Sequence, residues 1–359
     1  MLEIGNAAMF LCEEAGRSAV AAWEAAEKYM RSVKEGAMRI AAIDIGTVTS
    51  RLFVADVDAA GMRTVLRRSV ITNLGEGVDA SGLLSPEAIE RTVTTVAEYK
   101  RLIDECAADK PVDRIVALAT SASRDADNAG EFVTRLHDRG IELTVIPGQR
   151  EAELSFLGAA SDFRDENLLF ADIGGGSTEL VWGRANTGDN PLVPEVDIHT
   201  RESFNIGCRR MTERFLKSDP PSRDELVAAY SWARETLAPF FAGHAISCDR
   251  LVAVAGTPTS VVAVRDALVP YDSEKVHGAQ VTRKEFDGVA QRMFELPLEQ
   301  RMQVPGIQPQ RAGVFPAGIV ILTAVMDLAD VSRFTASESD ILKGIVLDAA
   351  RSSVKKKVL

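Results

Sequence analysis

Short runs of hydrophobic residues alternate along this chain with stretches in which hydrophobic residues recur at helical spacing. The run at 39–46 (RIAAIDIG) predicts a buried strand, and two more strands follow it around a turn at Ala60–Gly61. The spacing over 85–109 predicts a helix, with Ser85 as its N-cap and Pro86 at its first position. More strands and helices follow in the same alternation, which is typical of an α/β fold.

A second succession of strands and helices begins at Asn167 with the segment NLLFADIGGGSTELVWG. This segment predicts two strands joined by a glycine turn, and the later segment VAVAGTPTS predicts a strand, a turn at Gly256–Thr257 and a helix. The change from the first succession to the second falls near residues 160–167. Closer to the C-terminus the spacing predicts three helices, over 283–295, 315–328 and 338–351, the last with Ser337 and Ser339 as candidate N-caps.

The composition is that of a globular protein, and its charge narrows the class of partners. The 359 residues suit two domains, and the formal net charge is −11. This acidic balance argues against nucleic acid and anionic membranes as partners. The four cysteines include no Cys-x-x-Cys pair, which would have indicated a zinc or redox site.

No segment of the sequence has the features of a membrane span or a signal peptide. The most apolar segment, 313–326, is shorter than the roughly 18 residues that a membrane-spanning helix needs, so a buried core helix is predicted there. The N-terminus lacks a positively charged region. Residues 1–37 predict a helical extension in front of Met38, which is an alternative start of translation. These features predict a cytoplasmic protein.

The two successions begin with similar segments, AAIDIGTVTSRLFVAD and LFADIGGGSTELVWG. In each, an apolar strand ends in an acid, Asp44 or Asp172, and a glycine turn follows. Backbone N–H groups in such turns form a site for anions, and glycine lets a phosphate approach closely. The acid would repel a phosphate unless a divalent cation lies between them. Two such turns facing each other would hold a phosphate chain together with a metal ion.

Several further segments give the chain a resemblance to a known family. They are ALATSASRDADN, VIPGQREAELSFLGA, SFNIGCRRMTERFLKSDPPS, YDSEKVHG and SESDILKGI. With the glycine segment, they resemble the Ppx/GppA phosphatase family of the actin-like ATPase superfamily, from about Ile40 to Gly344. The resemblance implies two actin-like, ribonuclease H-like domains with a cleft between them. The first would span 38–165, with the C-terminal helix 338–359 packing back on it, and the second would span 166–337.

The resemblance also implies a role for individual residues. Glu151 matches the catalytic glutamate, whose carboxylate would accept a proton from the attacking water. Arg124 matches an arginine that contacts phosphate. Asp172, with Glu179 and Asp44, would hold Mg²⁺ or Mn²⁺. The remaining predicted phosphate-binding residues are Thr47, Thr49, Gly174, Gly175, Gly176, Ser177 and Arg210.

Two positions depart from the family pattern. Val48 stands where an asparagine is usual, and Gly313 stands where short members commonly carry an acid. The implied activity is that of an exopolyphosphatase acting on inorganic polyphosphate. Guanosine pentaphosphate (pppGpp) is an alternative substrate, and a catalytically weak polyphosphate- or alarmone-binding protein or an ATP-dependent kinase are alternative functions. The resemblance makes a homodimer a candidate assembly.

Overall fold

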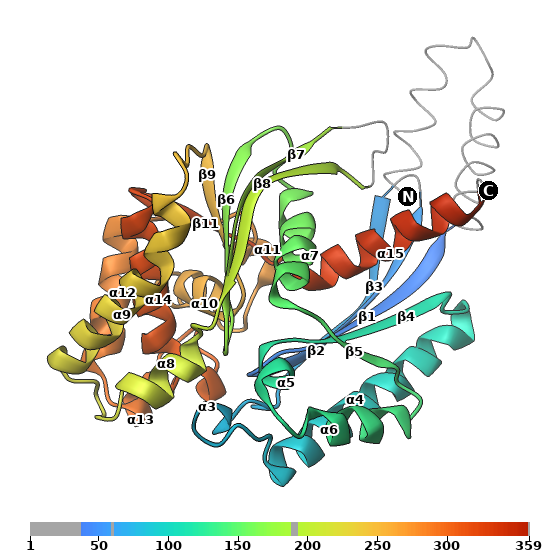
Figure 1. The fold of residues 1–359 in the computed structure, drawn as a ribbon, viewed down its shortest axis with the longest axis horizontal. Helices are drawn as coiled ribbons and strands as arrows, with labels where there is room; N and C mark the ends of the chain where they lie inside the picture. The colour runs from blue at the N-terminus through green and yellow to red at the C-terminus, as the bar shows by residue number, and fades with distance from the viewer. Residues whose placement is uncertain (1–36, 59–60, 188–192, 358–359) are drawn as a thin grey trace.

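The computed structural model describes residues 37–58, 61–187 and 193–357, and the chain in these ranges forms two mixed β-sheets with helices around them (Figure 1). The predicted extension 1–37 lies outside the described residues except for its last residue. One sheet is formed by strands from the first succession and the other by strands from the second. The predicted domain ranges themselves stay a prediction.

The first sheet has the strand order β3-β2-β1-β4-β5. Its strands are β1 (Met38–Ile45), β2 (Thr49–Asp58), β3 (Gly61–Ile71), β4 (Arg114–Ala119) and β5 (Leu143–Val145). The second sheet has the order β10-β11-β9-β6-β7-β8. Its strands are β6 (Asn167–Ile173), β7 (Thr178–Asn186), β8 (Glu195–Phe204), β9 (Arg250–Val254), β10 (Gln280–Thr282) and β11 (Arg333–Ala336).

The similarity between the two glycine segments of the sequence corresponds to the same arrangement of strands in both sheets. β1 pairs with β2 antiparallel and with β4 parallel, and β6 pairs with β7 antiparallel and with β9 parallel. In both sheets the acid is the second-last residue of the first strand of this arrangement. Each glycine turn therefore has the same position relative to its own sheet.

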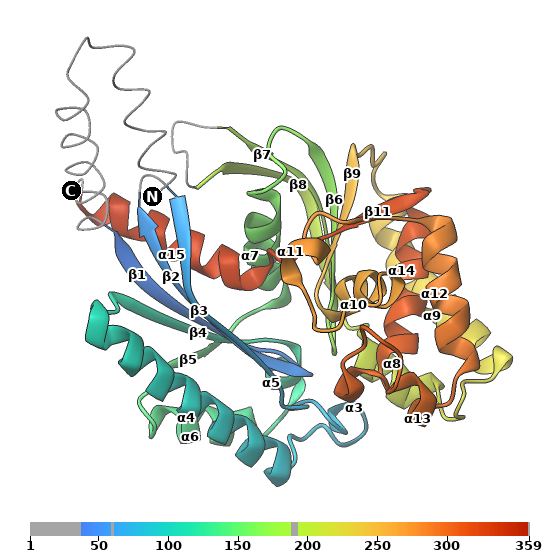
Figure 2. The ribbon, with the colours of Figure 1, turned by 180° about the vertical axis from the view of Figure 1, so that it is seen from behind.

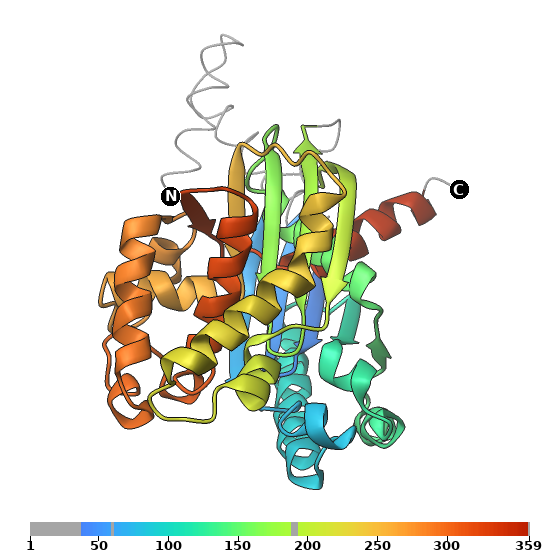
Figure 3. The same ribbon diagram turned by 60° about the vertical axis from the view of Figure 1, so that its left-hand side comes forward.

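The helices cover both faces of each sheet (Figures 1 and 2). Those of the first succession are α3 (Val78–Ser81), α4 (Pro86–Asp109), α5 (Ser121–Asp125), α6 (Ala129–His137) and α7 (Gly148–Ala160). Those of the second are α8 (Cys208–Phe215), α9 (Arg223–Ala242), α10 (Gly256–Arg265), α11 (Ser273–Val276), α12 (Arg283–Glu295), α13 (Leu298–Arg301), the 3₁₀ helix η1 (Pro309–Arg311), α14 (Phe315–Leu328) and α15 (Ile341–Lys357). Figure 3 shows α9, in yellow, in front of the green strands of the second sheet.

The last helix, α15, returns to the first sheet. Its residues Ile341, Ile345 and Val346 form one buried cluster with Ile40 of β1 and Phe53 of β2. α15 also packs on α7, and the two helices approach each other at a pair of glycines. Apolar burial of this kind is the main favourable contribution to holding α15 against the sheet.

The two helices can approach closely only because Gly158 and Gly344 lack side chains. A Cβ atom on Gly158 would lie 2.0 Å from the carbonyl oxygen of Asp340, and one on Gly344 would lie 1.8 Å from that of Leu154. Both distances are far below van der Waals contact, so only glycine fits at the crossing.

The predicted start of the last helix is wrong by three residues. α15 begins at Ile341, and the Oδ1 atom of Asp340 accepts a hydrogen bond from the backbone N–H of Leu342 at 3.0 Å. Ser337 instead accepts a hydrogen bond from the N–H of Ser339 at 3.0 Å, in the turn before the helix. The predicted core helix over 315–328 is confirmed as α14. No helix among the described residues is long and apolar enough to span a membrane.

Candidate active site

The two glycine turns meet between the sheets. A Cβ atom on Gly175 would lie 2.6 Å from Cγ2 of Val48, and one on Gly176 would lie 2.6 Å from Oγ1 of Thr47. The absence of side chains on these glycines thus allows the second turn to pack directly on the first. Val48, which departs from the family pattern, is buried in this contact.

A cavity of about 360 Å³ opens beside the two turns. Most of the predicted site residues line it, namely Asp44, Thr47, Thr49, Glu151, Asp172, Gly174, Gly175, Gly176 and Ser177. Arg124, Glu179 and Arg210 are not among its lining residues, and neither is Gly313. The structure therefore brings together predicted residues from both successions, from β1, β2, β6 and α7.

Glu151 lies in the first turn of α7 and is almost completely buried. Arg124 donates a hydrogen bond from Nη1 to the Oε2 atom of Glu151 at 2.5 Å and another to the carbonyl oxygen of Ile146 at 3.1 Å. Burial raises the pKa of Glu151 to about 7, although the guanidinium of Arg124 acts in the opposite direction. Glu151 can therefore accept or release a proton near neutral pH, and Arg124 orients it.

Asp172 and Glu179 are directly opposite each other on β6 and β7. Both are buried, and burial raises the pKa of Asp172 to about 6 and the pKa of Glu179 well above its usual range. Ser155 donates a hydrogen bond to the Oδ2 atom of Asp172 at 2.9 Å, and Ser203 donates one to the Oε1 atom of Glu179 at 2.7 Å. Two like charges in directly opposite positions destabilise a sheet unless a proton or a cation neutralises them.

These two carboxylates fit a divalent cation whose remaining ligands come from other groups. Among the described residues, no group of three or more His, Cys, Asp or Glu side chains is placed to hold a metal ion. Magnesium usually binds one or two carboxylates and takes its remaining ligands from water and substrate phosphates. Asp172, which lines the cavity beside the two turns, and Glu179, which lies opposite it outside the lining, have this chemistry.

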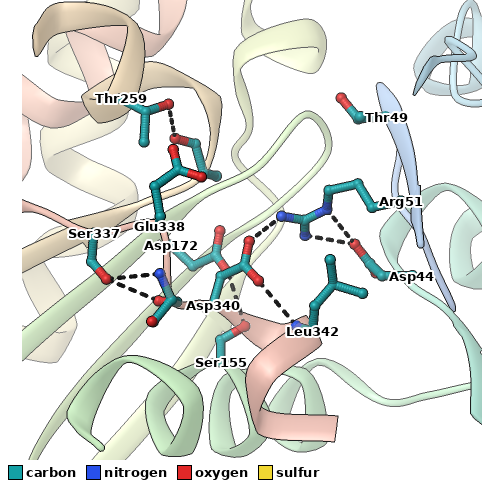
Figure 4. A network of polar contacts seen from close by, with 12 residues as sticks. Asp44, Thr49, Arg51, Ser155, Asp172, Thr259, Ser337, Glu338, Asp340 and Leu342 are labelled. Atoms are coloured by element: carbon teal, nitrogen blue, oxygen red, sulfur yellow. Dashed lines mark hydrogen bonds and ion pairs between the residues drawn. The ribbon is translucent and has the colours of Figure 1, made fainter. Parts of the chain in front are cut away.

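Arg51 connects the start of α15 with the first glycine turn (Figure 4). Its Nε and Nη2 atoms donate hydrogen bonds to the Oδ2 atom of Asp44 at 3.0 and 2.6 Å, and its Nη1 atom is paired with Asp340. One oxygen of Asp44, a predicted metal ligand, is therefore held by a guanidinium. Neither Arg51 nor Asp340 was predicted to be a site residue from the sequence.

Arg210 lies on α8 and joins the two halves of the molecule. It forms ion pairs with Asp79 and Asp125 of the first half, and its Nε atom donates a hydrogen bond to the carbonyl oxygen of Gly176 at 3.0 Å. The neighbouring Arg209 donates a hydrogen bond to Asn73 at 2.6 Å. Two carboxylates thus already neutralise Arg210, and its role in binding phosphate stays a prediction.

Arg311 lines the cavity but was not identified from the sequence. Its Nη2 atom donates a hydrogen bond to Oγ1 of Thr49 at 3.1 Å, and no carboxylate among the described residues forms an ion pair with it. A Cβ atom on Gly256 would lie 1.6 Å from its Nη1 atom, so this glycine makes room for the guanidinium. A half-buried guanidinium without a carboxylate partner among the described residues is well suited to an anionic ligand.

Comparisons with known proteins show which sequences and structures this chain is similar to. The sequence model of the Ppx/GppA phosphatase family matches residues 53–353. The chain is 36% identical over 329 residues to exopolyphosphatase 2 of Mycobacterium tuberculosis, covering 87% of this chain and 98% of the relative. The crystal structure of an exopolyphosphatase-like protein (34% identity, 89% and 99% of the two chains, TM-score 0.81) and that of the Aquifex aeolicus Ppx/GppA family member (30% identity, 88% and 99%, TM-score 0.73) are similar to it.

Proposed function

Because the chain belongs to the Ppx/GppA phosphatase family, we propose that it hydrolyses phosphoanhydride bonds and releases terminal orthophosphate from inorganic polyphosphate. The observation that carries this proposal is the position of Glu151. A buried carboxylate whose pKa is about 7 lines the same cavity as the two glycine turns and Arg311, which has no carboxylate partner among the described residues. A general base close to phosphate-binding groups is what attack of water on a terminal phosphoryl group requires.

In the proposed reaction the N–H groups of the turns and Arg311 hold the terminal phosphates. Glu151 accepts a proton from a water molecule while the water oxygen attacks the terminal phosphorus atom. The bond from this phosphorus to the bridging oxygen breaks, and the shortened chain leaves with that oxygen. Mg²⁺ or Mn²⁺ held by Asp172 and Glu179, with Asp44 as a further predicted ligand, would offset the charge of the phosphate oxygens.

Guanosine pentaphosphate is the second candidate substrate, and one observation favours it. The ring of Tyr271 is exposed at the edge of the cavity, where it offers a flat surface for stacking of a nucleobase. The phosphate groups of this substrate would use the same turns. A catalytically weak binding protein is less well supported. Val48, the substitution that suggested it, packs on Gly175, and Glu151 still lines the cavity.

We expect purified protein to release orthophosphate from polyphosphate when magnesium is present and to stop when a chelator removes the metal. The measurement compares long-chain polyphosphate, tripolyphosphate, guanosine pentaphosphate and ATP in parallel assays. Release from guanosine pentaphosphate alone would replace the first candidate substrate by the second. If the protein binds polyphosphate but releases no phosphate from any of these compounds with magnesium or manganese, the hydrolase proposal is wrong.

We also expect the activity to depend on pH through Glu151. A base acts only when deprotonated, so kcat/KM should fall as the pH is lowered through about 7, the pKa to which burial raises this group. Arg124 lowers this pKa, so Arg124→Gln should move the acid side of the profile to higher pH. The profile is measured as kcat/KM between about pH 5 and 9 at saturating magnesium. An acid side near the ordinary pKa of glutamate in both proteins would contradict the assignment.

A further inference from the structure

The cavity is open on one side, where its exposed lining residues lie. Three of them, Arg67, Arg68 and Ser69, belong to the edge strand β3. The others belong to the second half: Tyr271 and Gln308 lie in loops, and Ser273 is the first residue of α11. We call this side the mouth of the cavity. The reacting end, at Glu151 and Asp172, is buried. A polyanion longer than the cavity must therefore leave it through the mouth.

Glu338 lies across this mouth, in the segment between β11 and α15. The Nη2 atom of Arg67 donates a hydrogen bond to the carbonyl oxygen of Glu338 at 2.8 Å, and its Nη1 atom lies 3.8 Å from Oε2 of the carboxylate. The hydroxyl of Tyr271 donates a hydrogen bond to Oε1. Glu338 thus connects a residue of the first half with a residue of the second.

The carboxylate of Glu338 occupies the donors that a phosphate group would use. Tyrosine hydroxyl and guanidinium groups donate hydrogen bonds to phosphate oxygens as readily as they do to carboxylate oxygens. Figure 4 shows the carboxylate on the side of Thr259, away from Arg51, so Glu338 does not belong to the ion-pair group of Asp44 and Asp340. Its negative charge therefore faces the route of the chain through the mouth and has no part in the neutralised pairs at the reacting end.

We propose that Glu338 is a specificity-determining residue that disfavours long polyanions. A chain that extends from Glu151 through the mouth has to displace the carboxylate from Tyr271 and Arg67, and it meets the repulsion of a like charge on its way. A substrate that ends inside the cavity avoids both effects. The proposal rests on the proposed function and adds a preference for short polyphosphates to it.

The test replaces Glu338 by glutamine, since an amide oxygen still accepts the hydrogen bond from Tyr271 while the charge is removed. For Glu338→Gln we expect KM for long-chain polyphosphate to fall by about five-fold. This is the effect expected when one charge that repels the substrate is removed from a partly exposed site. KM for tripolyphosphate should change less than about two-fold, and kcat for both should be unchanged within the same limit. Glu131→Gln is the matched control, because Glu131 is exposed on α6 and does not line the cavity.

Binding gives a second measurement that does not depend on turnover. In proteins that also carry Glu151→Gln, the dissociation constant of long-chain polyphosphate should be about five-fold lower with Glu338→Gln than without it, and the difference should shrink as salt is added. Equal changes for long and short chains, or no change in either KM or the dissociation constant, would overturn the proposal. If the parent protein releases no phosphate at all, the proposed function fails, and the binding comparison still decides about Glu338.

A variant without a change of charge separates repulsion from simple opening of the mouth. Tyr271→Phe releases the carboxylate from one donor but leaves its charge in place. Since the charge stays, we expect KM for long-chain polyphosphate to fall by less than about two-fold in Tyr271→Phe, with a melting temperature close to that of the parent. A gain equal to that of Glu338→Gln would mean that the hydrogen bond, and not the charge, limits long chains, and the charge-based proposal would be wrong.

Discussion

Replacement of Glu151 by glutamine is expected to lower kcat by about 10²–10⁴-fold, the usual contribution of a general base. Glutamine keeps the size of the side chain and an oxygen that accepts the hydrogen bond from Arg124, but it cannot take a proton from water. Since Glu151 lines the cavity without supplying the phosphate-binding donors, KM should change little. Steady-state phosphate release from polyphosphate, with binding measured separately, gives both quantities.

Glu153 provides the matched control on the same helix. It lies two residues after Glu151, is partly exposed, and forms ion pairs with Arg150 and Arg201. Exposed ion pairs contribute little to stability, so Glu153→Gln should keep activity within about two-fold of the parent. If both variants lost activity to the same extent, or if neither did, the assignment of Glu151 as the base would be wrong.

Replacement of Gly344 by alanine is expected to be the most destabilising single change described for this fold. The added Cβ would lie 1.8 Å from the carbonyl oxygen and 2.7 Å from the carbonyl carbon of Leu154. Backbone atoms of a helix cannot move singly, so α7 and α15 have to separate. Overpacking of this kind costs about 3 kcal/mol, which corresponds to a fall in melting temperature of about 6–12 °C for a domain of this size.

The same change should also lower activity, because α7 carries Glu151. Gly288→Ala is the control, since Gly288 lies inside α12 and a Cβ atom there would meet nothing within 4 Å. Alanine in a helix interior is about 0.5–1 kcal/mol more favourable than glycine, so this control should be slightly more stable than the parent. A melting temperature of Gly344→Ala equal to that of the parent would contradict the close crossing of the two helices.

The fold class and the centre of the site could be predicted because their determinants are local in sequence. The predicted α/β fold is confirmed by the two sheets and by the related crystal structures. The strand, acid and glycine turn around Asp44 and around Asp172 are each contained in one short segment. Their repetition predicted two similar units, and the structure shows the turns in contact at Val48 and Gly175.

Residues paired across long separations could not be predicted in this way. Arg51 is paired with Asp340 across 289 positions, and Arg311 is bonded to Thr49 across 262. Neither arginine lies in a pattern that distinguishes it from an ordinary surface cation, because only the folded chain places it beside the cavity. The ion pairs of Arg210 could not be predicted for the same reason. Its residue type suits phosphate, but the fold pairs it with Asp79 and Asp125.

Short strands at the side of a sheet were also missed. β10 and β11 have three and four residues, too few for an alternating pattern to be recognised. β11 becomes a strand by pairing with β9, and β10 becomes one by pairing with the outer edge of β11. The cytoplasmic location and the homodimer stay predictions, as do the metal ligands and the catalytic base.

The return of α15 to the first sheet has a consequence for the synthesis of the protein. The face of β1 and β2 that carries Ile40 and Phe53 is covered by residues near position 345, about 300 positions later in the chain. The nascent chain therefore exposes this apolar face during nearly the whole of translation. The opposite face of the sheet can already be covered by α4, which is made soon after β1 and β2. The nascent first sheet is a surface that a chaperone can bind, and its folding is completed only after the second sheet has been made.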